Sequence, residues 1–356
     1  MAISALALAV LFPLRRAYIK EQICGPGARR ELIKGRHEIM NQGIRMKHDD
    51  AATVAGEMSF QERYMAFLMS ELPRLKTVAL YPDKERRKLD KREVLLTALD
   101  LISPDGEGIC LEFGVYKGKS LRAMARHFPQ RRFYGFDSFE GFPEDGRADW
   151  QKSFAVSSLP EVPSNCTLVK GWFDETLEPF LQQHSAPVDF IDIDCDIYSS
   201  TSYVLQTLLR ENRLRPGTII YFDELLNYAT HPWHEMLALF ELLEAGGFGL
   251  RWICMHQRLL LVDDVLHMHA TRTFPKWGDM QKKGYEAPAA LQLTAEGIDY
   301  GPLHLPHYRK RVKAMARQFA DLTGQFEAGQ IRHDTTKPFY ERARLFIKHN
   351  ILRKGI

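Results

Sequence analysis

The stretch "ICLEFGVYKGKSLRAMARHF", residues 109–128, passes from an apolar run through two glycines into a segment with helical spacing. Residues 109–113 are predicted to form a buried strand, because short apolar runs before a turn are typical of parallel sheets. Gly114 and Gly118 bracket the turn, and residues 120–128 carry apolar side chains three and four positions apart. A strand, a tight turn and a helix in this order predict one βα unit of a parallel sheet.

The same alternation continues on the C-terminal side. Further strands are predicted at residues 132–136, 166–170, 188–193 and 217–222, with helical segments between them. Residues 250–256 and 258–262 are close enough in sequence to form an antiparallel pair at the sheet edge. The predicted fold class is therefore α/β, with a doubly wound, mostly parallel sheet.

Three parts are predicted along the chain. Residues 93–263 hold the sheet, residues 1–92 form an N-terminal apolar segment with a helical extension, and residues 264–356 form a basic C-terminal extension. Composition is ordinary for a globular protein, with 45% hydrophobic and 26% charged residues. The five scattered cysteines argue against a disulfide framework or a zinc site and favour a reducing compartment. A cytoplasmic location is therefore predicted.

Both ends of the chain are basic. Residues 1–48 hold nine Lys and Arg against three Asp and Glu, and residues 303–356 hold twelve against four. Such ends either meet an anionic partner, such as lipid headgroups or a charged glycan, or form a solvated basic face. The apolar run at residues 1–14 is shorter than the roughly 20 residues that span a bilayer. It is predicted to be a packed or interfacial helix, with peripheral membrane anchoring as the alternative.

Acidic residues stand where the first two predicted strands end. Glu112 comes just before the glycine turn, whose backbone amides can approach a ligand closely. Asp137 ends the next strand, where a carboxylate can accept the hydroxyls of a ribose. The glycine spacing is G-x-x-x-G, not the G-x-G-x-x-G of dinucleotide sites, which weakens a nicotinamide interpretation.

A larger acidic group follows the next two strands. The stretch "FIDIDCDIYSST", residues 190–201, contains three acidic side chains, and two more follow the strand at 217–222. These five residues are Asp192, Asp194, Asp196, Asp223 and Glu224. Carboxylates that converge on one sheet edge repel one another unless a cation neutralises them, and Mg²⁺ is the hard ion that suits oxygen ligands. The alternative is a set of caps on exposed loops.

With these motifs, the chain resembles the class I S-adenosylmethionine-dependent methyltransferases, most closely the macrocin O-methyltransferase type that acts on sugar hydroxyls. The resemblance rests on "LEFGVYKGKS", "YGFDSFEGFPED", "LVKGWFDETL", "FIDIDCDIYSST" and "GTIIYFDELLNY", in that order, and covers about residues 90–263. It implies a seven-stranded, Rossmann-like sheet with helical N- and C-terminal additions.

The resemblance also implies site residues. Cofactor contacts are expected at Glu112, Gly114, Gly118, Ser120, Asp137, Ser138, Gly171, Trp172 and Asp192. Metal ligands are expected at Asp194, Asp223 and Glu224, although catechol-type relatives would use Asp192 in place of Asp194. Trp172 is either an adenine contact or a core aromatic residue. Cys195 stands where catechol-type enzymes carry a lysine base, so that base is not carried over.

The predicted reaction is magnesium-assisted methylation of a hydroxyl on a small molecule or glycan, with S-adenosylmethionine as donor. Candidate catalytic groups are Asp194, Asp196, His231 and His234, although a histidine at a helix start is often a cap. The alternative is a non-catalytic member of the fold that binds membrane or an anionic polymer through its basic ends. No nucleic-acid signature is found. The sequence leaves open whether the chain forms a homo-oligomer.

Overall fold

The computed structural model describes residues 57–80, 90–142, 154–226, 231–256, 266 and 287–327. The described residues from Met58 onward belong to one compact unit. The apolar run at residues 1–14 and the predicted strand at 258–262 lie outside the described residues, as does the C-terminal end after residue 327.

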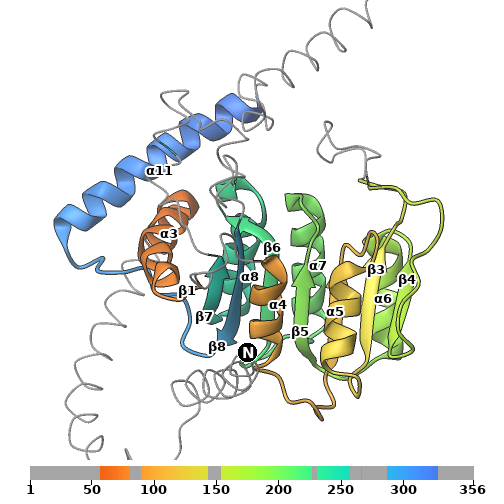
Figure 1. Cartoon of the computed structure of the whole chain (residues 1–356). Helices are drawn as coiled ribbons and strands as arrows, with labels where there is room; N and C mark the ends of the chain where they lie inside the picture. Colours follow the sequence, from red (N-terminus) through yellow and green to blue (C-terminus); the bar gives the residue numbers. More distant parts are fainter. Residues whose placement is uncertain are drawn as a thin grey trace, which may run out of the picture. The chain divides into compact units, whose positions relative to one another are not determined.

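The described residues form one eight-stranded sheet (Figure 1). Its strands are β1 (Ala79–Leu80), β2 (Ile109–Phe113), β3 (Phe133–Asp137), β4 (Cys166–Lys170), β5 (Val188–Ile193), β6 (Ile219–Leu226), β7 (Gly249–His256) and β8 (Ala287–Thr294). The spatial order is β1-β7-β8-β6-β5-β2-β3-β4, and only β8 runs antiparallel to its neighbours. The prediction of a doubly wound, mostly parallel sheet is confirmed. Eight strands replace the predicted seven because the short β1 pairs with the end of β7.

The antiparallel partner of β7 differs from the prediction. β7 pairs with β8 on one side and β1 on the other. β8 comes from the predicted C-terminal extension and lies between β7 and β6. Its sequence, "APAALQLT", is rich in residues with low strand propensity, but its small side chains are buried where a helix packs closely on the sheet. The predicted boundary at 263/264 therefore does not enclose the whole sheet.

Helices cover both faces of the sheet. α4 (Lys91–Leu99) and α5 (Lys119–His127) lie on one face (Figure 1), and α6 (Phe173–Gln183), α7 (Tyr198–Arg210) and α8 (Glu235–Gly246) pack side by side on the other. Right-handed crossovers explain this division, because the chain winds outward from β2 to β3 and in the opposite direction from β5 to β6. Under α4 and α5 the core includes Leu95, Leu121, Phe133 and Phe190.

Two further helices extend this unit. α3 (Phe60–Lys76) begins with a capping box between Ser59 and Glu62, and α11 (Pro306–Glu327) packs against it (Figure 1). Tyr64 of α3 contacts the rings of Phe240 and Phe319, which joins α3, α8 and α11. The predicted boundary at 92/93 therefore separates residues that pack together. None of the described helices is both long and apolar enough to cross a membrane.

Candidate functional site

The strand order reverses between β2 and β5, so the loops after these two strands lie side by side. In open α/β sheets this position forms a crevice where ligands bind. The Asp194 amide donates to the Phe113 carbonyl at 2.9 Å, which ties the two loops together. Gly114 has φ of +98°, and a Cβ there would lie 2.0 Å from the carbonyl oxygen of Asp194. Only glycine therefore allows this approach.

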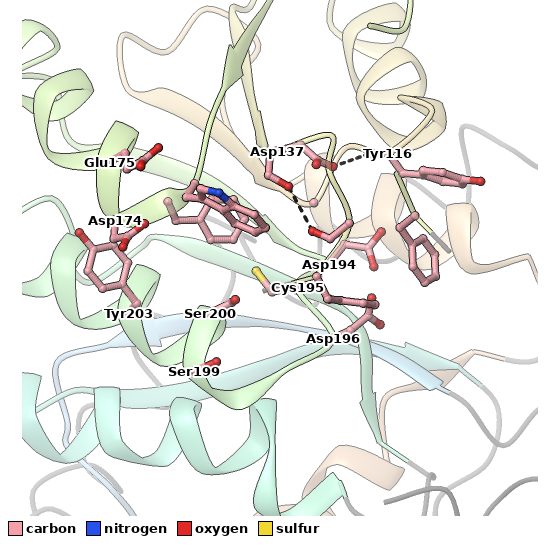
Figure 2. Close-up of a pocket in the computed structure, with 17 residues that line it drawn as sticks. Tyr116, Asp137, Asp174, Glu175, Asp194, Cys195, Asp196, Ser199, Ser200 and Tyr203 are labelled. Atoms are coloured by element: carbon pink, nitrogen blue, oxygen red, sulfur yellow. Dashed lines mark hydrogen bonds between the residues drawn. The ribbon is translucent and has the colours of Figure 1, made fainter. Parts of the chain in front are cut away.

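Asp137 holds the glycine turn by accepting backbone hydrogen bonds. Its Oδ2 accepts from the amides of Val115 and Tyr116 at 2.8 and 2.7 Å, and its Oδ1 accepts from the amide of Phe139 at 2.6 Å. Figure 2 shows the bond between Asp137 and Tyr116. The end of β3 is thereby fixed against the loop after β2.

A pocket of about 380 Å³ opens at this edge. In Figure 2, Asp194, Cys195 and Asp196 lie between Asp137 and the pair Ser199 and Ser200. The lining residues are Gly114, Tyr116, Asp137, Ser138, Gly141, Phe142, Phe154, Trp172, Phe173, Asp174, Glu175, Asp194, Cys195, Asp196, Ser199, Ser200 and Tyr203. Trp172 is half-buried and lines this pocket, which favours the ligand contact over the core position.

Four of the predicted cofactor contacts line the pocket, namely Gly114, Asp137, Ser138 and Trp172. The other five, Glu112, Gly118, Ser120, Gly171 and Asp192, are outside its lining. Sequence reasoning missed the aromatic pair Phe142 and Phe154, whose rings are 5.3 Å apart. Their signal was weak, because two phenylalanines separated by a polar segment resemble ordinary core residues.

Two buried acids lie at the base of the site. Glu112 of β2 and Asp192 of β5 are direct neighbours across the sheet and are almost completely buried. Ser120 donates to Glu112 Oε1, whereas Glu112 Oε2 and both Asp192 oxygens have no hydrogen-bond partner among the described residues. Burial, with smaller contributions from Asp137 and Asp223, raises the pKa of Glu112 to about 8. Burial and the nearby Glu112 likewise raise the pKa of Asp192 well above its ordinary value.

Asp196 has a strained backbone beside the pocket. Its φ is +62°, and the Ile197 amide donates to the Cys195 carbonyl at 2.8 Å, which closes a γ-turn around Asp196. Non-glycine residues rarely adopt this conformation, and such strain is often found at functional sites. Asp194 lies two residues earlier, and desolvation with the charges of Asp223 and Asp196 raises its pKa well above the ordinary value.

Asp223 and Glu224 share one cation. Lys91 Nζ, on the first residue of α4, donates to Asp223 Oδ2 at 2.6 Å and to Glu224 Oε1 at 3.1 Å. Tyr221 donates its hydroxyl to Asp223 Oδ1 at 2.9 Å. Burial by itself lowers the pKa of Lys91, but the charges of Glu224 and Asp223 outweigh it and raise that pKa well above its ordinary value. Lys91 had no motif that could have marked it in the sequence.

The predicted metal ligands do not fit a metal ion in this arrangement. Within the described part of the chain, no three His, Cys, Asp or Glu side chains are grouped so that they could hold one. Of the predicted ligands Asp194, Asp223 and Glu224, the last two already contact Lys91. Magnesium assistance therefore has no support from the geometry.

The predicted catalytic histidines lie apart from the pocket lining. His231 belongs to the short 3₁₀ helix η1 (His231–Trp233), and His234 precedes α8; both are buried. Glu235, which the sequence reasoning overlooked, is also buried. Burial, together with Asp196, Glu224 and Asp223, raises the pKa of Glu235 well above its ordinary value. Its place in "WHEM", just after the fifth predicted strand, was the available signal.

Comparison with known families gives a match over the centre of this site. Residues 111–225 match a family described as "Methyltransferase domain". This part of the chain is therefore similar to a methyltransferase domain. The match runs from β2 to β6 and includes Gly114, Asp137, Asp194 and Asp223 of the candidate site.

Several solved structures are similar to this chain. The calicheamicin methyltransferase CalS11 is 24% identical with a TM-score of 0.40, and the match covers 63% of this chain and 91% of that one. A putative O-methyltransferase from Klebsiella pneumoniae is 16% identical with a TM-score of 0.36, covering 64% and 90%. The O-methyltransferase from Bacillus cereus in complex with SAH is 15% identical with a TM-score of 0.32, covering 66% and 92%. No curated protein matches the chain.

Proposed function

We propose that this domain binds S-adenosylmethionine in the pocket of about 380 Å³ and transfers its methyl group to a hydroxyl of an acceptor. The observation that carries the proposal is the convergence of Gly114, Asp137 and Asp196 on one pocket at the point where the strand order reverses. Gly114 and Asp137 are placed to contact the cofactor, and Asp196 is placed to contact the acceptor.

The cofactor positions follow from the groups around the pocket. Asp137 Oδ2 accepts two amides and Oδ1 accepts one, so Oδ1 keeps a lone pair for a ribose hydroxyl. Trp172 and Phe173 offer aromatic surfaces to an adenine. Glu112 and Asp192 are buried and lie outside the pocket lining, so neither is given a contact with the cofactor.

S-adenosylmethionine, when bound, supplies a methyl group on a positively charged sulfur. Transfer to the acceptor oxygen would break the bond between sulfur and this carbon, and the acceptor hydroxyl would have to lose its proton. Asp196 would receive that proton, because it lines the pocket from a strained turn. Ser199 and Ser200, at the start of α7, would hold the acceptor by hydrogen bonds.

The proposed acceptor class is a sugar or a glycosylated small molecule. Support comes from the resemblance of "DCDIYSST", residues 194–201, to sugar O-methyltransferases. No step is assigned to magnesium, because Lys91 already bridges Asp223 and Glu224.

A second proposal concerns the basic ends of the chain. The described part of α11 exposes a run of cations consisting of Arg309, Lys310, Arg311, Lys313 and Arg317. Such a face attracts anionic surfaces or polymers through its charge. Co-sedimentation with anionic vesicles at rising salt would test this interaction, and no binding at low salt would remove it.

Calorimetric titration with S-adenosylhomocysteine tests the cofactor site. Wild type should bind, and Trp172→Ala should weaken binding by roughly tenfold or more, since stacking on a base contributes about 1–3 kcal/mol. Trp233→Ala is the matched control, because Trp233 stacks on Phe319 outside the pocket. Equal weakening in both variants, or no binding by wild type, would contradict the proposal.

Methyl transfer needs a separate assay. Wild type would be incubated with labelled S-adenosylmethionine and a panel of free and nucleotide-linked sugars, followed by mass spectrometry of the products. Asp196→Asn should abolish product while leaving S-adenosylhomocysteine binding intact. Unchanged product formation in this variant would remove Asp196 as the base.

A further inference from the structure

Lys91 stands at the centre of the acidic side of the site. Its ammonium donates to Asp223 and Glu224, and the three side chains are 34%, 23% and 18% exposed. Opposite charges this close, with little water around them, are weakly screened. The positive charge of Lys91 also lowers the pKa values of Asp192, Asp194 and Glu235, against the larger opposing effect of their burial.

A bulge in β6 brings two adjacent acids to this one lysine. Neighbouring side chains of a regular strand point to opposite faces, so Asp223 and Glu224 would normally diverge. The pairing of β6 with β8 shifts register between Phe222 and Leu226, where Pro288 of β8 lacks an amide donor. The bulge lets both carboxylates reach Lys91 Nζ.

We propose that Lys91 takes the place of a divalent metal ion in this domain, so that cofactor binding and methyl transfer need no metal. Only the statement about methyl transfer rests on the proposed function, whereas the replacement of a metal ion by Lys91 does not. A magnesium ion would need carboxylate oxygens at about 2.0–2.1 Å. Asp223 Oδ2 instead bonds Lys91 Nζ at 2.6 Å, and Asp223 Oδ1 bonds Tyr221 at 2.9 Å. Both oxygens of this carboxylate are therefore engaged.

Lys91 acts in this scheme through the carboxylates that it holds. An ammonium carries three N–H donors, and Asp223 and Glu224 account for two of them. Lys91 is outside the pocket lining, so it is a positioning residue and has no contact with the acceptor.

Mn²⁺ uptake tests the inference without any methyl acceptor. Mn²⁺ prefers the same oxygen ligands as Mg²⁺ and is detected directly by electron paramagnetic resonance. Wild type stripped with EDTA should take up no Mn²⁺ at millimolar concentration. Lys91→Met, which leaves the carboxylates without their cation, should take up Mn²⁺ and should gain thermal stability from it.

Lys119→Met is the matched control, since Lys119 is exposed and is likewise the first residue of its helix, α5. This variant should resemble wild type in Mn²⁺ uptake and melting temperature. Stoichiometric Mn²⁺ uptake by wild type would overturn the proposal, and so would equal uptake by Lys91→Met and wild type. The wild-type titration decides the question even if Lys91→Met fails to fold.

The outcome is separable from that of the proposed function. S-adenosylhomocysteine binding in EDTA tests the cofactor site, and Mn²⁺ uptake tests Lys91. If wild type binds both S-adenosylhomocysteine and Mn²⁺, the proposed function stands and the proposed role of Lys91 is wrong. If wild type binds neither ligand, the proposed cofactor site is wrong and the proposed role of Lys91 stands.

Discussion

The two sides of the pocket are held together in different ways. On the side of the glycine turn (residues 114–118), backbone amides donate to Asp137, so the carboxylate has all three partners within 22 residues along the chain. On the acidic side, Asp223 and Glu224 depend on Lys91, more than 130 residues earlier. Hydrogen bonds from backbone amides to one strand-end carboxylate fix the glycine turn, and both the turn and the carboxylate can be recognised as short motifs. The charge balance of the acidic side instead depends on a lysine that is distant in sequence.

Among the variants that test this comparison, Gly114→Ala should lose the most stability. The new Cβ would lie 2.0 Å from the Asp194 carbonyl oxygen, and we expect a loss of more than about 3 kcal/mol in the free energy of unfolding. Gly217→Ala is the control, because Gly217 has a similar φ of +103° but no atom within 4 Å of a new Cβ. It should cost only the strain of a left-handed residue, roughly 1–2 kcal/mol. Equal losses in urea unfolding would show that the close approach is unimportant.

Asp137→Asn should have the next largest effect. An asparagine keeps one acceptor oxygen and turns its amide group toward backbone donors, so we expect a loss of about 2–3 kcal/mol. Binding of S-adenosylhomocysteine should fall as well. Asp90→Asn is the control, because Asp90 caps α4 by accepting from the Arg92 amide and asparagine caps equally well. Wild-type stability in Asp137→Asn would contradict the role given to the three amides.

The raised pKa of Glu112 predicts that the stability of the protein depends on pH. Its pKa rises from an ordinary value of 4.5 to about 8, so the folded chain holds a proton that the unfolded chain has lost between these pH values. Stability is then fully present below pH 4.5 and falls as pH rises toward 8, by on the order of 1 kcal/mol per pH unit. Glu112→Gln should fall less steeply over this interval in urea unfolding. Parallel profiles for the two proteins would contradict the assignment.

Asp192→Asn should have the smallest effect, in contrast to Asp137→Asn. Within the described part of the chain, neither oxygen of Asp192 has a hydrogen-bond partner, and burial raises its pKa, so a neutral side chain of the same shape loses no bond. We expect a change near zero or a slight stabilisation at neutral pH. Urea unfolding of the two asparagine variants side by side measures the difference between the two acids. A loss as large as that of Asp137→Asn would mean that Asp192 has a structural partner.

Much of the sheet was predictable from the sequence. β2, β4 and β5 have the predicted bounds, because their short runs end at turn residues and stand in one continuous alternation with helices. β8 was missed because its alanines and Pro288 have low strand propensity, and its position depends on packing against α4 and pairing with β6.

The candidate site was predictable in part. Asp137 and Gly114 were identified from their place at strand ends, although the amide partners of Asp137 were not foreseen. Acidic residues were also found, but the cation expected beside them was Mg²⁺, whereas Lys91 is the cation that the structure places there. A contact between a helix start and a distant strand leaves no local pattern, so spacing alone could not reveal it.

Hydrogen exchange with and without S-adenosylhomocysteine tests most directly the claim that the cofactor binds across the end of the sheet. We predict added protection in residues 114–118, 137–142 and 171–175, and none in α11 (Pro306–Glu327). Those three segments border the pocket, whereas α11 packs on α3. Protection confined to α11, or no change in the three segments at saturating ligand, would contradict the account.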